Sequence, residues 1–84
     1  MSEIVTPGIY QHYKGNNYKV ICVAKLEENP YQEYVVYQQL YESKIRGSEK
    51  LLPAGTCWMR SKKVFTEMVL NSEGQMVPRF KKIN

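Results

Sequence analysis

The sequence predicts a small all-β fold, either a barrel or a strongly bent antiparallel roll of five to six short strands, with at most one short helical turn. Gly, Pro and Asn recur so often that they cut the 84-residue chain into short segments. Several segments alternate apolar and polar side chains, and no apolar stripe of helical period continues for three turns. A sheet this small covers its apolar face by curling.

The first half of the chain supplies three predicted strands. Residues 1–7 are expected to form a loose arm, and a short strand follows over residues 9–13. The next strand covers residues 18–25 and places Tyr18, Val20, Cys22 and Ala24 on one face. The third covers residues 33–41 and places Val35, Tyr37, Gln39 and Tyr41 on one face. Gln on both faces of this strand suggests that one side reaches solvent or a ligand.

The middle of the chain is polar and interrupted by Gly and Pro, so residues 42–55 are expected to form a long exposed loop. A short strand over residues 56–60 carries the only Trp. Ser61 is expected to cap a single helical turn that ends near Phe65, because a serine hydroxyl can accept from the free N–H groups of a first turn.

The chain is predicted to end in a hairpin. Residues 67–70 and 76–82 form its strands, with a turn over residues 71–74. Pro78 lacks a backbone N–H, which implies an edge position or a bulge. Residues 1–84 together have room for one core, so a single domain is expected, and any ligand site must be a surface groove or shallow pocket.

The net charge of +4 is concentrated in the last third of the chain. Residues 1–57 are balanced, whereas residues 58–84 hold six basic side chains against Glu67 and Glu73. Such asymmetry is typical of a surface for nucleic acid or another acidic partner. It is also typical of a solvated basic edge that keeps a protein soluble, and the modest excess favours this second interpretation.

Cysteine and histidine usage argues against a metal site. Cys22 and Cys57 form no C-x-x-C pair and His12 is the only His, so a zinc site lacks ligands and no cofactor is indicated. Each Cys lies in an apolar run, which favours buried free thiols. Neither a secretory signal nor an apolar run of membrane-spanning length occurs, so no membrane partner and a cytoplasmic location are expected.

Motifs along nearly the whole chain resemble a bacterial family known as domain of unknown function 1653. They are PGIYQHYKGNNYKV (residues 7–20), VVYQQLY (residues 35–41), CWMR (residues 57–60), VFTE (residues 64–67) and VPRF (residues 77–80). The opening G-x-Y-x-H-Y-K-G and the closing P-R-F are the most specific. The resemblance implies a small SH3-like β-barrel and no established activity.

The chain departs from the family pattern at three places. The family has a His in a polar stretch after the second strand, where this chain reads Leu26-Glu27-Glu28-Asn29. The family's W-x-R is followed by Pro, here Ser61, and the segment between Tyr41 and Trp58 is longer than usual. A family site that used the missing His would be absent here.

The predicted ligand-binding residues centre on Trp58 and Arg60, which lie two apart on one strand and so share a face. Arg beside an aromatic ring suits anion recognition, because the guanidinium forks onto carboxylate or phosphate while the ring stacks. The alternative is a core Trp with Arg60 paired to Glu67. Arg79 is a similar strand Arg beside Phe80 and joins the predicted site.

Tyr37 also joins the site, because with Tyr41 and a first-strand Tyr, either Tyr10 or Tyr13, it could form an aromatic face. Such faces stack nucleobases or hold proline-rich peptides. Packing on a thin barrel, with the hydroxyls in water, is the favoured interpretation of these tyrosines. His12 and Lys14 are placed at the rim of the site. A structural role for His12 is favoured over a general base, because no nucleophile accompanies it.

These patterns predict a binding module without catalytic residues, for a protein, a peptide or another acidic ligand. No phosphate-binding loop, dinucleotide fingerprint, nucleophile elbow or zinc-protease motif occurs, and all eight acidic residues are Glu. A domain that binds RNA or single-stranded DNA is the first alternative. A small-molecule enzyme or sensor that uses His12 is the second. A homodimer formed through edge strands stays open.

Overall fold

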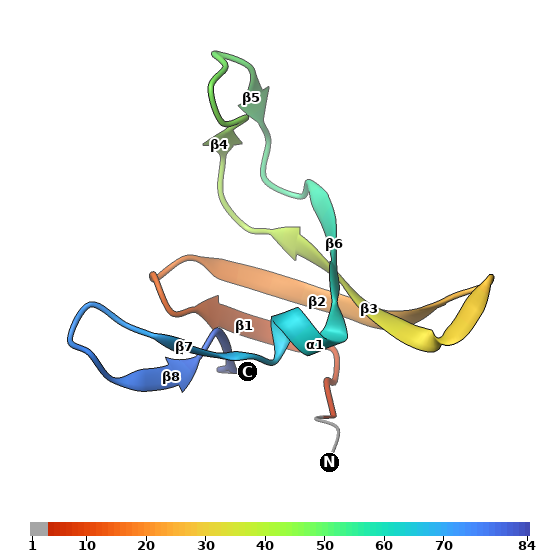
Figure 1. Cartoon of the computed structure of the whole chain (residues 1–84). Coiled ribbons are helices and arrows are strands. Elements are labelled where there is room, and N and C mark those ends of the chain that lie inside the picture. Colours follow the sequence, from red (N-terminus) through yellow and green to blue (C-terminus); the bar gives the residue numbers. More distant parts are fainter. Residues whose placement is uncertain (1–3) are drawn as a thin grey trace.

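The structure, a computed structural model, describes residues 4–84, so the first three residues of the expected N-terminal arm lie outside the description. Its main element is a five-stranded sheet in the order β6-β3-β2-β1-β9 (Figure 1). The strands are β1 (Gly8–His12), β2 (Asn17–Leu26), β3 (Asn29–Gln39), β6 (Cys57–Ser61) and β9 (Phe80–Lys82). Every pairing in this sheet is antiparallel.

Two short hairpins form separate two-stranded sheets beside this one. One pairs β4 (Ser43–Lys44) with β5 (Leu51–Leu52) inside the segment that was predicted to be a long loop, and Figure 1 shows it projecting away from the sheet. The other pairs β7 (Met68–Leu70) with β8 (Met76–Pro78). The predicted all-β class is confirmed as a strongly bent roll. Within residues 4–84 the sheet stays open, with β6 and β9 at its edges, and does not close into a barrel.

Alternation along β3 was predicted correctly, because Val35, Tyr37 and Gln39 are buried on one face. The face predicted for β2 is wrong beyond Val20. A β-bulge between Val20 and Cys22 shifts the register, so that Cys22 pairs with Val36 on the outer face and Val23 turns to the core. A bulge adds one residue to a strand and thereby reverses the faces that follow it.

The prediction of buried thiols is also wrong. Cys22 and Cys57 are both free and both exposed. They are exposed because both lie on the outer face of the sheet, where Cys57 pairs with Gln38.

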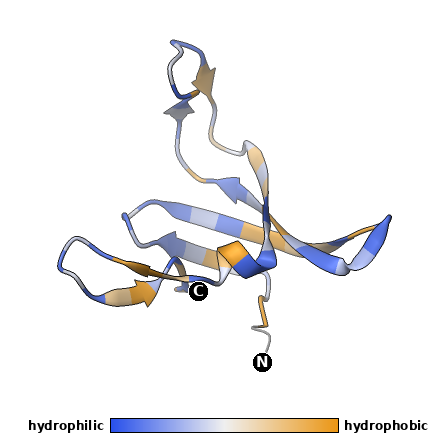
Figure 2. Ribbon diagram, viewed as in Figure 1, coloured by the Kyte–Doolittle hydropathy of each residue, from blue (hydrophilic) through white to orange (hydrophobic). Residues whose placement is uncertain are grey.

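The core lies on the inner face of the sheet and is mostly aromatic. The rings of Phe65 and Phe80 stack with their centroids 4.1 Å apart, and Tyr10 and Tyr37 pack against Phe65. Val20 and Val35 complete it and are 1% and 0% exposed. Figure 2 shows that hydrophobic residues also occur in β5 and β7, outside the five-stranded sheet.

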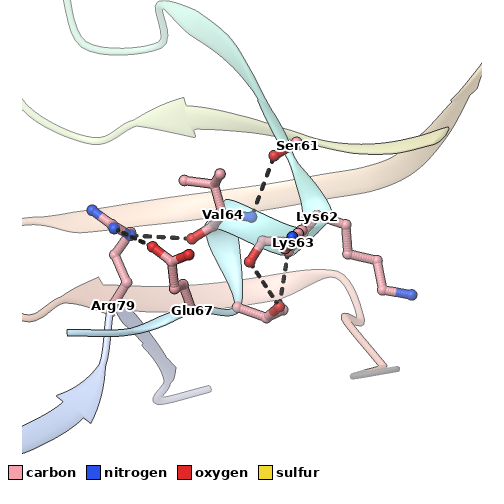
Figure 3. Close-up of polar contacts among 7 residues, drawn as sticks. Ser61, Lys62, Lys63, Val64, Glu67 and Arg79 are labelled. Atoms are coloured by element: carbon pink, nitrogen blue, oxygen red, sulfur yellow. Dashed lines mark hydrogen bonds and ion pairs between the residues drawn. The ribbon is translucent and has the colours of Figure 1, made fainter. Parts of the chain in front are cut away.

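The predicted helical turn is confirmed as α1 (Lys62–Phe65), which Ser61 caps with its hydroxyl accepting from the Val64 N–H. The turn inserts Phe65 into the core, where this side chain is 1% exposed. Arg79 holds the turn from the side (Figure 3), and its Nε donates to the Val64 carbonyl at 3.1 Å.

The last predicted strand is in fact two strands. Pro78 ends β8 at the edge of its hairpin, and the chain then enters the five-stranded sheet as β9. Arg79 joins the two sheets through its backbone, since its N–H donates to the Glu67 carbonyl and its carbonyl accepts from Tyr13 N–H. Pro78 interrupts no hydrogen bond of the β7–β8 ladder, because the next residue, Arg79, still donates to Glu67, and this fits the edge position expected for a proline.

Candidate functional site

A groove of about 420 Å³ lies between the β4–β5 hairpin and the inner face of β3 and β6. We call it the hairpin groove. Aromatic, cationic and neutral polar side chains line it, and no carboxylate does. The lining residues are Tyr18, Tyr37, Gln39, Tyr41, Ser43, Lys44, Ile45, Arg46, Leu52, Trp58 and Arg60.

Strand pairing places three of the predicted site residues in this groove. Tyr37 pairs with Trp58 across β3 and β6, and Arg60 lies two residues further along β6. Because alternate residues of a strand share a face, Trp58 and Arg60 both reach the groove. Trp58 keeps 41% of its surface exposed, so it is not a core residue.

Gln39 fixes the hairpin to the sheet. Its side chain is 1% exposed, and its Nε2 lies 2.9–3.2 Å from four oxygens at the hairpin base: Tyr41 O, Ser43 Oγ, Leu52 O and Pro53 O. Its Oε1 accepts from the indole N–H of Trp58 at 2.9 Å. The sequence suggested a solvent or ligand contact for one face of β3. On the inner face, Gln39 instead supplies the polar groups that hold this wall of the groove.

Three tyrosines form the aromatic side of the groove. The hydroxyls of Tyr18 and Tyr41 hydrogen-bond to each other, and the Tyr18 ring packs edge-on against both Tyr37 and Tyr41. Burial, and then the bond to Tyr41, raises the pKa of Tyr18 well above its usual range. Burial also raises the pKa of Tyr37, although the Arg60 guanidinium opposes part of the rise. Tyr18 and Tyr37 therefore stay neutral at physiological pH.

The expected aromatic face is thus formed by different partners. Tyr37 and Tyr41 contribute as proposed, but Tyr18 takes the place expected for Tyr10 or Tyr13. Tyr10 is a core residue whose hydroxyl is bonded to the Thr6 backbone. Only the pairing of β2 with β3, which puts Tyr18 beside Gln39, reveals this neighbour.

The groove carries three cations, Lys44, Arg46 and Arg60. Arg60 makes no ion pair within residues 4–84. Its expected alternative partner, Glu67, bonds to Arg79 at 3.0 Å instead (Figure 3). Lys44 contacts Glu49 at 3.3 Å, but both side chains are exposed, and such pairs are weak. Positive charge is therefore available to a ligand in the groove.

The other predicted site residues lie outside the groove. Arg79 is occupied by Glu67 and the Val64 carbonyl. Lys14 is exposed, with its Nζ 5.8 Å from the Tyr13 ring centroid. His12 lines a separate hollow of about 320 Å³ with Asn71 and Lys81 among its neighbours. Three of the six predicted residues therefore line the groove, and three do not.

His12 has the environment of a structural histidine. Its Nδ1 accepts from the Lys14 backbone N–H at 3.1 Å, and its ring packs edge-on against Phe80. Burial lowers its pKa below the ordinary value, and the positive charges of Arg60, Arg79 and Lys14 lower it further. The ring is therefore neutral near pH 7. Among the described residues, no carboxylate and no thiol lines its hollow.

Sequence reasoning missed Tyr18, Lys44 and Arg46 as groove residues. The two cations lie in the segment interpreted as a loop, and they reach the groove only because the β4–β5 hairpin is held against Gln39. Within the described residues, no group of three or more His, Cys, Asp or Glu side chains could hold a metal ion. No helix in residues 4–84 has the length and apolarity needed to cross a membrane.

Comparisons with known proteins agree on one family. The model of a family described as a protein of unknown function, DUF1653, matches residues 8–82. The crystal structure of a DUF1653 protein from Bordetella bronchiseptica superposes with a TM-score of 0.70 at 32% identity, covering 94% of this chain and 87% of that one. No curated protein matches the chain. The chain therefore belongs to the DUF1653 family.

Proposed function

We propose that this protein is a non-catalytic binding module that takes an acidic ligand in the hairpin groove. One observation carries the proposal: three cations and no carboxylate line a groove whose other walls are aromatic and neutral. A cleft lined by charge of one sign raises the local concentration of the opposite charge. The ligand class is therefore one that bears carboxylate or phosphate groups.

Arg60 is the proposed anchor for the anion. It is half-buried, its guanidinium lies 6.0 Å from the Phe80 ring centroid, and no acid in residues 4–84 neutralises it. A guanidinium with free donors can form two parallel bonds to a carboxylate or phosphate. The neutral hydroxyl of Tyr37 can donate a further bond, because its raised pKa keeps its proton in place at physiological pH.

Binding without catalysis is supported by the same residue set. The lining residues include no His, Cys, Asp or Glu, which are the usual general acids, bases and thiol nucleophiles. The hydroxyl of Ser43 is engaged with Gln39 rather than with a base. The free thiols of Cys22 and Cys57 support a reducing compartment, and we propose the cytoplasm.

A thermal-shift screen tests the proposal. The wild-type protein is heated with pyrophosphate, citrate, nucleotides, oligonucleotides and poly-glutamate at increasing concentrations. A ligand at about a hundred times its Kd stabilises by about 2.7 kcal/mol, which raises the melting temperature of a domain this size by roughly 10 °C or more. Arg60→Ala should lose most of that shift.

Lys19→Ala is the matched control, since Lys19 is an exposed cation on the outer face of the sheet, opposite Gln38. It should retain the wild-type shift. If every acidic ligand shifts Arg60→Ala and wild type equally, the groove is not the site.

A further inference from the structure

We propose that the acidic ligand of the hairpin groove is a single-stranded nucleic acid, with one base stacked on Trp58 and its phosphates on Arg60, Lys44 and Arg46. This inference rests on the proposed function and names its ligand. The juxtaposition that carries it is a fixed, half-open indole that shares one groove with cations from two different elements.

The indole is held ready for stacking. Its N–H donates to Gln39 Oε1 at 2.9 Å, and Gln39 is itself buried and bonded to the hairpin base. The ring edge is therefore fixed, while 41% of the residue stays exposed. A side chain that is already fixed loses little entropy when it binds, which favours stacking of a flat ligand.

The cations are spread in the way that a phosphate backbone requires. Arg60 comes from β6, whereas Lys44 and Arg46 come from the β4–β5 hairpin, which forms a different wall of the groove. A strand that passes between these walls can contact both with successive phosphates while a base lies on Trp58. A charged groove with an aromatic ring in it is the arrangement by which proteins bind single strands without reading their sequence.

The exposed ring of Trp58 favours a single-stranded nucleic acid over a nucleic-acid duplex and over an acidic peptide. A base can stack on Trp58 only if its face is open, and in a duplex that face is covered by its neighbours. An acidic peptide satisfies the cations equally well, but its carboxylates give the indole no flat ring to stack on. Stacking on Trp58 is therefore the signature that separates the ligand classes.

Trp58 is the only tryptophan in the chain, so its fluorescence reports on the groove alone. The full chain is titrated with oligothymidylate and oligouridylate of about ten nucleotides, within the range of site sizes for single-strand binding folds. A duplex of the same length and a poly-glutamate peptide are titrated in parallel. We expect the single strands to bind and to quench Trp58, and the duplex to bind more weakly.

The salt dependence counts the phosphate contacts. Three cations on a single strand predict that log K falls with log salt at a slope of about −2, since each contact contributes about −0.7. Arg60→Ala and Arg46→Ala should each reduce that slope by about 0.7. Lys19→Ala on the outer face should leave it unchanged.

Trp58→Leu should weaken single-strand binding at least about fivefold, the lower bound for loss of one base stack. Tyr31→Leu is the matched aromatic control, because Tyr31 is 96% exposed near the start of β3 and lies outside the groove. Arg46→Ala keeps the test valid if Trp58→Leu fails to fold, since Arg46 is exposed and makes no ion pair within residues 4–84.

Each outcome decides the proposal. If poly-glutamate binds in an Arg60-dependent way and the oligonucleotides do not, the ligand is a carboxylate peptide and only this inference fails. If the oligonucleotides bind without quenching Trp58, or bind Arg46→Ala and Arg60→Ala as tightly as wild type, they lie elsewhere and the inference is overturned. If neither these polyanions nor the small acidic ligands of the thermal-shift screen bind, the proposed function fails with it.

Discussion

Gln39→Leu is predicted to weaken the whole molecule and to release the β4–β5 hairpin. Gln39 is 1% exposed, and Leu keeps the approximate volume but removes every polar atom. The substitution removes three hydrogen bonds. Two are donated by the side-chain amide protons of Gln39 to oxygens at the hairpin base, and one is donated by the Trp58 indole N–H to Gln39. At about 1 kcal/mol for each bond, the expected loss is about 3 kcal/mol, more if the hairpin carbonyls stay buried.

Urea denaturation measures this loss, and a calorimetric scan should show the melting temperature falling by more than about 10 °C. Gln38→Leu is the control, because Gln38 is the adjacent residue on the same strand and points to the outer face. Its effect should stay within about 0.5 kcal/mol. If Gln39→Leu were as stable as Gln38→Leu, the hairpin would not depend on the buried amide and the reasoning would be refuted.

Three further predictions concern the backbone and the titrating groups. Gly8→Ala should lower the free energy of unfolding by about 1–3 kcal/mol, because Gly8 has φ +148° and a Cβ would lie 2.6 Å from the Asn84 carbonyl oxygen. An unchanged denaturation curve would contradict that packing. The pKa of His12 measured by NMR should lie below its ordinary value, so the unfolded chain binds the proton more tightly than the folded protein does. The free energy of unfolding should therefore fall as the pH drops below about 6.5, and His12→Gln should remove this pH dependence. A pKa above about 6.5 would reverse the direction in which stability changes with pH. Spectrophotometric titration should find Tyr18 ionising last among the tyrosines, and Tyr41→Phe should lower its pKa; equal titration of all the phenols would contradict the buried pair.

Local chemistry explains which parts of the fold were predictable. Ser61 as the cap of α1 follows from one hydroxyl before a short helical turn, and the buried face of β3 follows from alternation alone. The bulge after Val20 has no signal in the sequence, because its position depends on how β2 pairs with β3. The break between β8 and β9 was predictable in part. Pro78 indicates an edge position, but nothing in the sequence predicts that the chain passes from one sheet to the other at Arg79.

The groove was predictable only in part, for a similar reason. Trp58 and Arg60 were found because two residues of one strand share a face whatever the tertiary structure is. Lys44 and Arg46 come from the hairpin, and they line the groove only because the buried Gln39 holds the hairpin in place. In the sequence, Gln39 looks like any other polar residue. His12 was predicted at the rim of the site; it lines a separate hollow, and its ring lies 6.4 Å from that of Tyr18, which lines the groove.

Amide and side-chain N–H chemical shifts during a pyrophosphate titration give the most direct test that an anion sits in the hairpin groove. The account predicts that the largest changes fall on the Arg60 Nε–H, the Trp58 indole N–H and the backbone of residues 43–46. Changes confined to the hollow beside His12, or to the outer face around Lys19, would contradict it.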